Sequence, residues 1–310
     1  MALLTTDEVL AQLQQGQSLC QAELSHINLR GANLDRGQFA RAYLRAADLS
    51  GASCQEADFS QAMLMFAVLS GATLTQADLT NAKLNSARLN GANLREVRAA
   101  QVRLYAATLH HLDAALAHLN GADFREATGQ GAKFTGASLE KANLGASNFP
   151  QTTFSEATLV QAVFDGAELT ETIWHQADLE RAILTRTRLA GADFTQANLL
   201  GANLRAADLT GAIARQAEFQ QATLNNAQLR QVDFTEASLF SANLERANLV
   251  QVNFSGADLR DANLEHTVWE GGNFTHCKVS GATFTAAQGL TSAQQQWLID
   301  NGALNVPCDR

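Results

Sequence analysis

The amino-acid sequence predicts an all-β solenoid, and three periodic observations carry this prediction. A Leu or Phe stands at every fifth position from Leu24 to Phe284, in 45 of 53 places, without one slip of register. Ala stands two residues earlier in 39 of the 53 places, so the unit reads A-x-L-x-x, as in Ala32-Asn33-Leu34. Aromatic residues also recur every twenty positions, which indicates the length of one coil.

A period of five excludes the two regular alternatives. On an α-helix, a five-residue step turns the side chain by about 140°, so the leucines would scatter around the cylinder. On a continuous strand, successive leucines would point to opposite faces and half of them would be exposed. The chain therefore has to bend once per repeat, so that every Leu and Ala points to a common axis, as in a solenoid.

The aromatic residues define the length of the coil. Seven of eight sites spaced by twenty residues are aromatic: Phe134, Phe154, Trp174, Phe194, Ala214, Phe234, Phe254 and Phe274. Gly31, Gly51 and Gly71 begin a second series with the same spacing. Because stacked coils place similar residues above one another, four repeats make one coil. The 53 repeats then give about thirteen coils, and a rod of about 63 Å at ~4.8 Å per coil.

The repeats occupy residues 21–286, and short helices are expected to cap both ends, where a solenoid exposes its core. Within residues 1–20, a helix is expected to start at Thr6, to place Val9 on its apolar side and to stop near Gly16.

Residues 287–310 form the expected C-terminal cap helix and tail. Ser292 with Gln295 resembles a capping box, Trp297 supplies apolar cover, and Gly302 ends the helix. No proline-rich, glycine-rich or charged linker interrupts the repeats, so residues 1–310 are interpreted as one domain.

The core sites contain a few exceptions that bear on ligand binding. Eight central sites are neither Leu nor Phe: Cys54, Ala99, Ala114, Gly129, Trp174, Ala214, Trp269 and Val279. Gly129 is the least compensated of them and indicates a bulge or a small void. A locally repacked core is favoured over a ligand cavity at these places.

The tandem unit A-D/N-L-x-x, as in Ala77-Asp78-Leu79, resembles the pentapeptide-repeat family over about nine-tenths of the chain. The resemblance implies a right-handed quadrilateral β-helix built from short turns and bridges. The frequent Asn or Asp before the central Leu suits tight turns, because a short polar side chain can bond nearby backbone amides.

Composition narrows the class of protein. The net charge of −9 is spread thinly along the repeats, which argues against a nucleic-acid-binding protein with its usual basic patch. Neither a secretion signal nor an apolar run of about 20 residues is present, so no membrane span is expected. Cys20, Cys54, Cys277 and Cys308 show no paired or metal-type spacing, which fits a reducing cytoplasm.

The sequence contains no catalytic constellation. The nearest group of metal-ligating residues is His110, His111, Asp113 and His118, but these fall on different faces of the expected coil, so a solvated surface is favoured. No glycine-rich phosphate loop precedes a helix. We therefore expect no enzyme activity, no catalytic residue, no metal and no cofactor.

Outward-pointing apolar residues are the better candidates for function. The first candidate partner site consists of Tyr43, Met63, Met65, Phe66, Val68 and Tyr105. The second consists of Val160, Leu200 and Phe240, which recur every two coils. Contiguous exposed apolar side chains tend to mark partner sites, whereas single ones are ordinary or serve packing between rods.

A mildly basic band lies beside the first candidate site. Its members are Lys83, Arg88, Arg95, Arg98 and Arg103. A solvated face is the favoured interpretation, and the steering of an acidic partner is the alternative.

Two functions follow as hypotheses. The first is a non-enzymatic scaffold or regulator that presents the faces of a rigid rod to a protein partner in the bacterial cytoplasm, as monomer or as homodimer through the C-terminal cap. The alternative, which comes from the family resemblance, is a DNA mimic that binds a type II topoisomerase and protects it from quinolones or toxins. Duplex DNA of about 63 Å carries about 37 negative charges, far more than this chain, which argues for the scaffold.

Overall fold

Parallel bridges between residues twenty positions apart organise the chain. In the computed structural model, which describes residues 4–307, Glu23 pairs with Tyr43 and Tyr43 pairs with Met63. Further series of such bridges begin at Asn28, Asn33 and Gln38, so each stretch of twenty residues carries four bridges. The chain is therefore a β-helix, and its bridges have the twenty-residue period that the aromatic column predicts.

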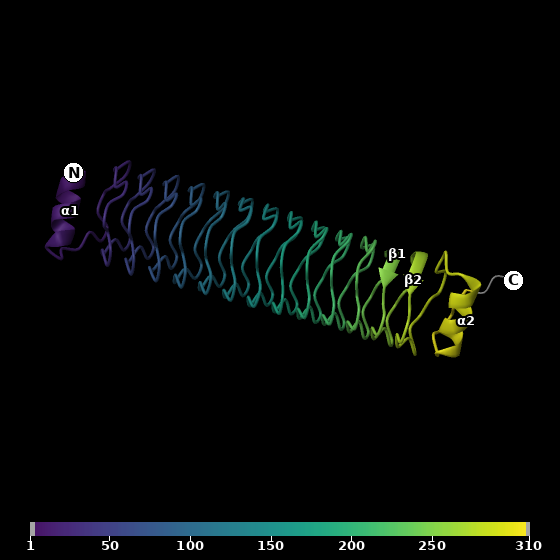
Figure 1. Cartoon of the computed structure of the whole chain (residues 1–310). Helices are drawn as coiled ribbons and strands as arrows, with labels where there is room; N and C mark the ends of the chain where they lie inside the picture. The colour runs from purple at the N-terminus through teal and green to yellow at the C-terminus, as the bar shows by residue number, and fades with distance from the viewer. Residues whose placement is uncertain (1–3, 308–310) are drawn as a thin grey trace. The chain divides into compact units, whose positions relative to one another are not determined.

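Two compact units make up the chain, Met1–Thr158 and Leu159–Arg310. Lys133 pairs with Thr153 in the first unit, and Val163 pairs with Ile183 in the second, always in parallel. Within each unit the coils lie one above the next in Figure 1. The assignment of residues 1–310 to one domain stays a prediction.

Extended pairing is longest near the C-terminus. Strand β1, Asn248–Asn253, pairs in parallel with β2, Val268–Asn273, again with a shift of twenty residues. Elsewhere the contacts between coils are isolated bridges, because the chain bends at every fifth residue. Among residues 4–307, no helix is long and apolar enough to span a membrane.

The predicted core sites point inward. Leu44, Leu64, Ala42 and Ala62 are fully buried, as are nearly all other Leu, Phe and Ala sites of the repeat. Small Ala side chains let the backbone approach the axis closely, while Leu and Phe fill the remaining volume. The interpretation of these sites as core is confirmed.

The corners of the coil combine a left-handed residue with a side-chain hydrogen bond. The residue two positions after the central Leu or Phe has positive φ, as at Gln61 with φ 57°. The Oδ1 atom of Asp48 accepts from the backbone N of Ser50 at 2.9 Å, and many Asn and Asp residues repeat this bond. The predicted role of Asn and Asp in the turns is confirmed.

Aromatic rings stack from coil to coil inside each unit. The stacked pairs of the predicted column are Phe134–Phe154 in the first unit, and Trp174–Phe194, Phe234–Phe254 and Phe254–Phe274 in the second. Ring centroids in these pairs lie between 5.2 and 6.2 Å apart. Such contacts stabilise by about 0.5–1.5 kcal/mol beyond their buried area.

Helix α1, Thr6–Gln14, begins where the sequence predicts, but its N-cap is Thr5. The Thr5 hydroxyl accepts from the backbone N of Glu8 at 3.3 Å, and the Glu8 carboxylate accepts from the Thr5 N–H at 2.7 Å. Val9 is fully buried, and Gly16 follows the helix end with φ +69°.

The predicted capping box of the C-terminal helix is wrong by one residue. Helix α2, Ser292–Asp300, is capped by Thr291 with Gln294, because the cap precedes the first helical residue and pairs three positions on. The side chain of Gln295 is instead buried and donates to the Leu290 carbonyl at 3.2 Å. The Trp297 ring stacks on Phe274 at 5.7 Å, which extends the aromatic column onto α2.

The predicted bulge or void at Gly129 is absent, because an aromatic ring occupies the space. The bridge from Thr128 to Asn148 keeps its register. A Cβ added at Gly129 would lie 2.1 Å from Cε1 of Phe149, whose side chain is fully buried. The ring of the next coil thus replaces the missing Leu side chain.

Buried tryptophans at central sites are paired with threonines at Ala sites. The Trp269 Nε1–H donates to the Thr267 hydroxyl at 2.8 Å, and that hydroxyl donates to the Leu264 carbonyl at 2.6 Å. Trp174 and Thr172 repeat the first of these bonds at 2.8 Å. The pairing follows from the rule that a buried indole N–H needs an acceptor.

We predict that Thr267→Val lowers the free energy of unfolding by about 1–3 kcal/mol, because the indole N–H of Trp269 loses its acceptor. Urea unfolding followed by tryptophan fluorescence measures this loss. Thr187→Val is the matched control, since the Thr187 hydroxyl makes the same bond to the Leu184 carbonyl but serves no indole. Equal losses in the two variants would contradict the role of Thr267.

We predict that Gly129→Leu and Phe149→Leu each destabilise the first unit but compensate each other when combined. The first change forces a side chain into the ring of Phe149, and the second leaves a cavity. The double variant restores Leu at both central sites and is expected to recover about 1–3 kcal/mol relative to the sum of the single losses. Thermal unfolding of the four proteins gives the coupling; additive losses would contradict it.

Candidate partner-binding face

Tyr43 and Met63 lie side by side on one face of the first unit. They form a parallel bridge, so their side chains project from neighbouring coils at the same height. Tyr43 is 42% exposed, and Met63 is half-buried. The structure thus brings together two of the predicted partner-site residues.

Met65 and Phe66 form the corner that follows this face. Phe66 is 50% exposed and has a φ of 62°, a left-handed conformation that bulky side chains seldom adopt. The guanidinium carbon of Arg45, one coil earlier, lies 4.9 Å from the centroid of the Phe66 ring. A cationic group therefore holds this exposed ring in place.

Val68 extends the apolar surface around the corner onto the next face. It is half-buried and bridges to Asp48 on one side and Arg88 on the other. Tyr43, Met63, Met65, Phe66 and Val68 thus form one surface, which we name the corner patch.

Tyr105 lies outside the corner patch. The backbone N of Phe66 donates to the Asn85 carbonyl at 3.1 Å, and that of Ser86 donates to the Tyr105 carbonyl at 2.9 Å. A polar coil therefore separates Tyr105 from Phe66. A hydrogen bond with Glu126 raises the pKa of the Tyr105 hydroxyl, so this side chain is engaged with its own neighbours.

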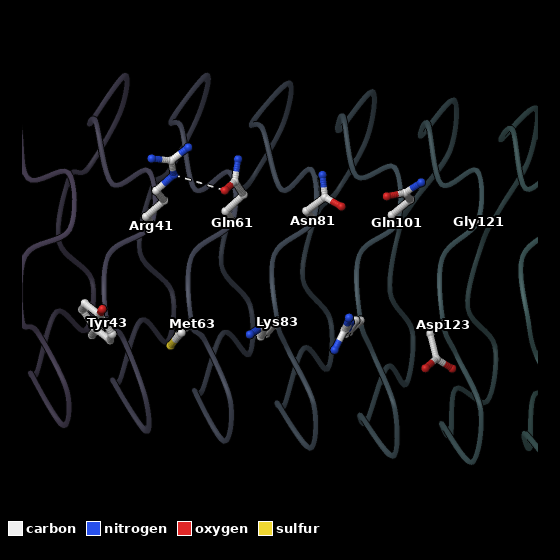
Figure 2. Close-up of a pocket in the computed structure, with 10 residues that line it drawn as sticks. Arg41, Tyr43, Gln61, Met63, Asn81, Lys83, Gln101, Gly121 and Asp123 are labelled. Atoms are coloured by element: carbon white, nitrogen blue, oxygen red, sulfur yellow. Dashed lines mark hydrogen bonds between the residues drawn. The ribbon is translucent and has the colours of Figure 1, made fainter.

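A groove of about 900 Å³ begins at the corner patch and runs across the coils of the first unit. Figure 2 shows that Arg41, Gln61, Asn81, Gln101 and Gly121 line one side, and that Tyr43, Met63, Lys83 and Asp123 line the other. Arg103 bridges Lys83 and Asp123 and completes the second row. The residues between the rows, such as Ala62 and Ala82, are fully buried, so their side chains leave the groove open.

The charges of the groove are unevenly paired. The Arg41 Nε–H donates to the Gln61 side-chain oxygen at 3.1 Å, and the Arg125 guanidinium binds the Asp123 carboxylate at 2.8 Å. The hydrogen bond from Arg125 holds the pKa of Asp123 below its usual value. Among residues 4–307, no carboxylate lies within ion-pairing distance of the side-chain nitrogens of Lys83 or Arg103.

The predicted basic band is divided by the structure. Arg95 pairs with Asp113 at 3.6 Å, and Arg98 pairs with Asp78 at 3.3 Å, so these two cations are balanced locally. Arg88 lies on the same series of bridges as Val68. Lys83 and Arg103 alone of the five line the groove.

The second candidate site is not a continuous surface. Val160, Leu200 and Phe240 are half-buried, and Glu180 and Gln220 occupy the same corner position in the coils between them. The backbone N of Gln161 donates to the Glu180 carbonyl at 2.9 Å, which places this acidic residue directly beside Val160. The Arg260 guanidinium carbon lies 5.8 Å from the Phe240 ring centroid.

Leu116 is an exposed apolar residue that the sequence analysis missed. It is 50% exposed, has a φ of 59°, and lines a separate groove with Glu96 and His118. The available signal was its place in the repeat, the left-handed corner position where polar residues and glycine predominate.

His110 makes a hydrogen bond to the backbone of the next coil. The His110 Nδ1 accepts from the backbone N of Gln130 at 3.1 Å. No group of three potential metal ligands occurs within the described part of the chain.

Burial raises the pKa of the Cys54 and Cys277 thiols to about 12. Cys308 lies outside the described residues.

The family model for pentapeptide repeats matches the chain in overlapping stretches from residue 18 to residue 288. The chain belongs to the pentapeptide-repeat family. Only residues 99–116 within that range are unmatched, and this segment holds the irregular core sites Ala99, Val102, Leu112 and Ala114. Proteins of this family are generally scaffolds for structure and interaction.

Several solved structures of pentapeptide-repeat proteins are similar to this chain. HetL from the cyanobacterium Nostoc sp. strain PCC 7120, described as involved in heterocyst differentiation regulation, is 26% identical, with 91% of this chain and 97% of HetL covered and a TM-score of 0.39. Trypsin-treated QnrB1, a plasmid-mediated fluoroquinolone resistance protein, is 15% identical, with 62% and 94% covered and a TM-score of 0.35.

Rfr23 from the cyanobacterium Cyanothece 51142 is 20% identical, with 51% of this chain and 91% of Rfr23 covered and a TM-score of 0.20. The comparison with curated proteins gives no significant match. The family assignment therefore rests on the repeat model.

We predict that Phe66→Asn leaves the stability of the protein within about 1 kcal/mol of the original. Asn adopts the left-handed conformation more readily than Phe, and this gain offsets the lost contact with Arg45, which contributes about 0.5–1 kcal/mol. Thermal unfolding measures the change. Leu116→Asn, at the same corner position and equally exposed, is the matched control; a loss above about 2 kcal/mol at Phe66 alone would show that its ring has a structural role.

Proposed function

We propose that this chain is a non-enzymatic interaction protein, a scaffold or regulator, whose corner patch binds a protein partner in the bacterial cytoplasm. The observation that carries the proposal is Phe66. Its large apolar side chain is half exposed at a backbone conformation that disfavours it, although polar residues, glycine and alanine occupy the same position in nearly all other coils.

The neighbours of Phe66 support the proposal. Met65 and Met63 offer flexible, polarisable side chains, and Tyr43 offers an aromatic ring with a polar end. Aromatic residues and Met are enriched in the buried centres of protein interfaces, where charged residues are depleted. Tyr105 is included in the proposed face as a peripheral contact beyond Asn85. Val160, Leu200 and Phe240 form a second, weaker candidate.

The proposal includes the finer features of the scaffold. We propose a right-handed quadrilateral β-helix of about thirteen coils along residues 21–286, with α1 and α2 as caps. The buried Val9 of α1 and the stacking of Trp297 on Phe274 support the capping roles. Monomer and homodimer through the C-terminal cap are both compatible with this proposal.

The DNA-mimic alternative has less support. A net charge of −9 is small beside that of a duplex of similar length, and the groove described above carries cations without an ion pair among the described residues. The surface features of the first unit therefore favour a partner with both apolar and acidic groups.

We predict that Met65→Glu combined with Phe66→Glu abolishes partner capture. A photo-crosslinking amino acid in place of Val68, at the rim of the patch, should join the chain to one protein in a lysate of its own organism. Two carboxylates at the centre of the interface would have to be desolvated, so the crosslink should fall at least about tenfold. Mass spectrometry of the crosslinked product identifies and quantifies the partner.

The matched control replaces two exposed apolar residues elsewhere, Leu116→Glu and Ile183→Glu, and is expected to keep the crosslink. Circular dichroism checks that both double variants are folded. Retention of the crosslink in the Met65 and Phe66 variant would exclude the corner patch as the binding site.

A further inference from the structure

The groove beside the corner patch differs from the rest of the surface in charge. The whole chain carries −9, yet Arg41, Lys83 and Arg103 line this groove against one carboxylate, Asp123. Asp123 is itself bound by Arg125, which lies outside the groove lining. A local excess of positive charge therefore faces solvent along one side of the groove.

Lys83 and Arg103 occupy the same position in two neighbouring coils. They form a parallel bridge, so their backbones lie about 4.8 Å apart. Neither side chain has an ion pair within the part of the chain that the structure describes. Like charges at directly bridged positions disfavour each other, and an anionic ligand that binds both side chains would relieve this repulsion.

We propose that this groove binds an extended acidic segment of the protein partner, with a hydrophobic residue of that segment seated against Tyr43 and Met63. This inference rests on the proposed function, because Tyr43 and Met63 belong both to the corner patch and to the groove. It adds the chemistry of the partner segment, which is a short acidic stretch next to an apolar anchor residue.

The dimensions and the chemistry of the groove fit such a segment. From Tyr43 to Asp123 the groove crosses four coil spacings, about 19 Å, which is the length of about six extended residues. Gln61, Asn81 and Gln101 lie in the row opposite the cations, and their amide side chains offer both donors and acceptors for a peptide backbone (Figure 2).

The order of groups along the row from Tyr43 to Asp123 sets the order of side chains that a bound peptide presents, whichever way its backbone runs. Tyr43 and Met63 form the apolar end, Lys83 and Arg103 form the cationic middle, and Asp123 closes the far end. Asp123 is already bound by Arg125, so it offers no cation to an acidic residue beyond the middle. The preferred segment is thus an apolar residue with a few acidic residues on one side of it.

A nucleic acid is a poorer occupant on the same grounds. Affinity for nucleic acid comes from many phosphate contacts along a broad basic surface, whereas this groove offers three cations, Arg41, Lys83 and Arg103, and ends at a carboxylate. The apolar pair Tyr43 and Met63 at one end instead provides a contact for an aliphatic side chain.

Fluorescence anisotropy with the full chain tests the proposal. The probe is a fluorescein-labelled peptide of about eight residues that contains a leucine followed by glutamates, and a peptide with lysines in place of glutamates is its counterpart. We expect saturable binding of the acidic peptide that weakens with salt, and no binding of the basic one.

Lys83→Glu combined with Arg103→Glu should weaken binding of the acidic peptide by at least about tenfold, and replacement of the leucine in the peptide should weaken it as well. The matched control is Arg30→Glu combined with Lys133→Glu, which changes the net charge equally at exposed cations outside the groove lining. This control should lower the affinity by less than about threefold.

Three results would overturn the proposal. They are the absence of binding to the acidic peptide, equal loss in the two charge-reversal variants, and tighter binding of a DNA duplex at the same residues. The crosslink from the Val68 position separates this proposal from the proposed function. If Lys83→Glu with Arg103→Glu keeps the crosslinked partner while Met65→Glu with Phe66→Glu loses it, the corner patch stands and the acidic segment is excluded.

Discussion

Parallel hydrogen bonding between successive coils is the constraint on which the structure of each unit depends. The backbone N of Leu44 donates to the Met63 carbonyl at 2.9 Å, and the equivalent bond recurs at nearly every central site. Buried amides need partners, so each coil must keep the register of the next. A residue is therefore fixed beside the residues twenty positions before and after it. The twenty-residue period of the sequence therefore becomes columns of residues that run from coil to coil. The surface patches of each unit are made of neighbouring members of such columns.

The same constraint sets the conformational strain at the corners. Each bend places one residue in the left-handed region of backbone conformation, which Gly and Asn adopt readily and large side chains disfavour. The chain uses Gly, Gln, Arg, Glu and Asn at most of these places, and Phe66 and Leu116 are the large apolar exceptions among the exposed ones. Because an exposed apolar ring is not stabilised by water, the proposed function assigns Phe66 to a contact with another molecule.

The sequence predicted the core better than the surface, because the core depends on the period of the repeat and the surface depends on individual side-chain conformations. The core sites, the aromatic stacking and the Asn and Asp turns depend on period alone, and the structure confirms them. The capping box predicted for α2 was one residue too late, because the cap residue precedes the first helical residue. Gly129 was interpreted as a bulge or void because composition does not show that the Phe149 ring leans into its place. The division of the basic band could not be read from the sequence either, because Arg95 and Arg98 reach Asp113 and Asp78 through their own side-chain conformations.

The bridged positions of Lys83 and Arg103 distinguish the groove from the rest of the surface. Where like charges occupy bridged positions elsewhere, a neighbour relieves them: Asp58 bridges Asp78, but the Arg98 guanidinium lies 3.3 Å from the Asp78 carboxylate. Opposite charges also occupy bridged positions and form ion pairs there: Arg188 binds Glu168 at 3.0 Å. Lys83 and Arg103 have no salt bridge among the described residues, and the next residue of their series, Asp123, is bound by Arg125. A chain selected for stability alone has no use for two adjacent unpaired cations, because like charges directly opposite each other destabilise a pair of strands. Their position between an apolar pair and a carboxylate that is already bound makes complementarity to an acidic ligand the simplest physical account of them.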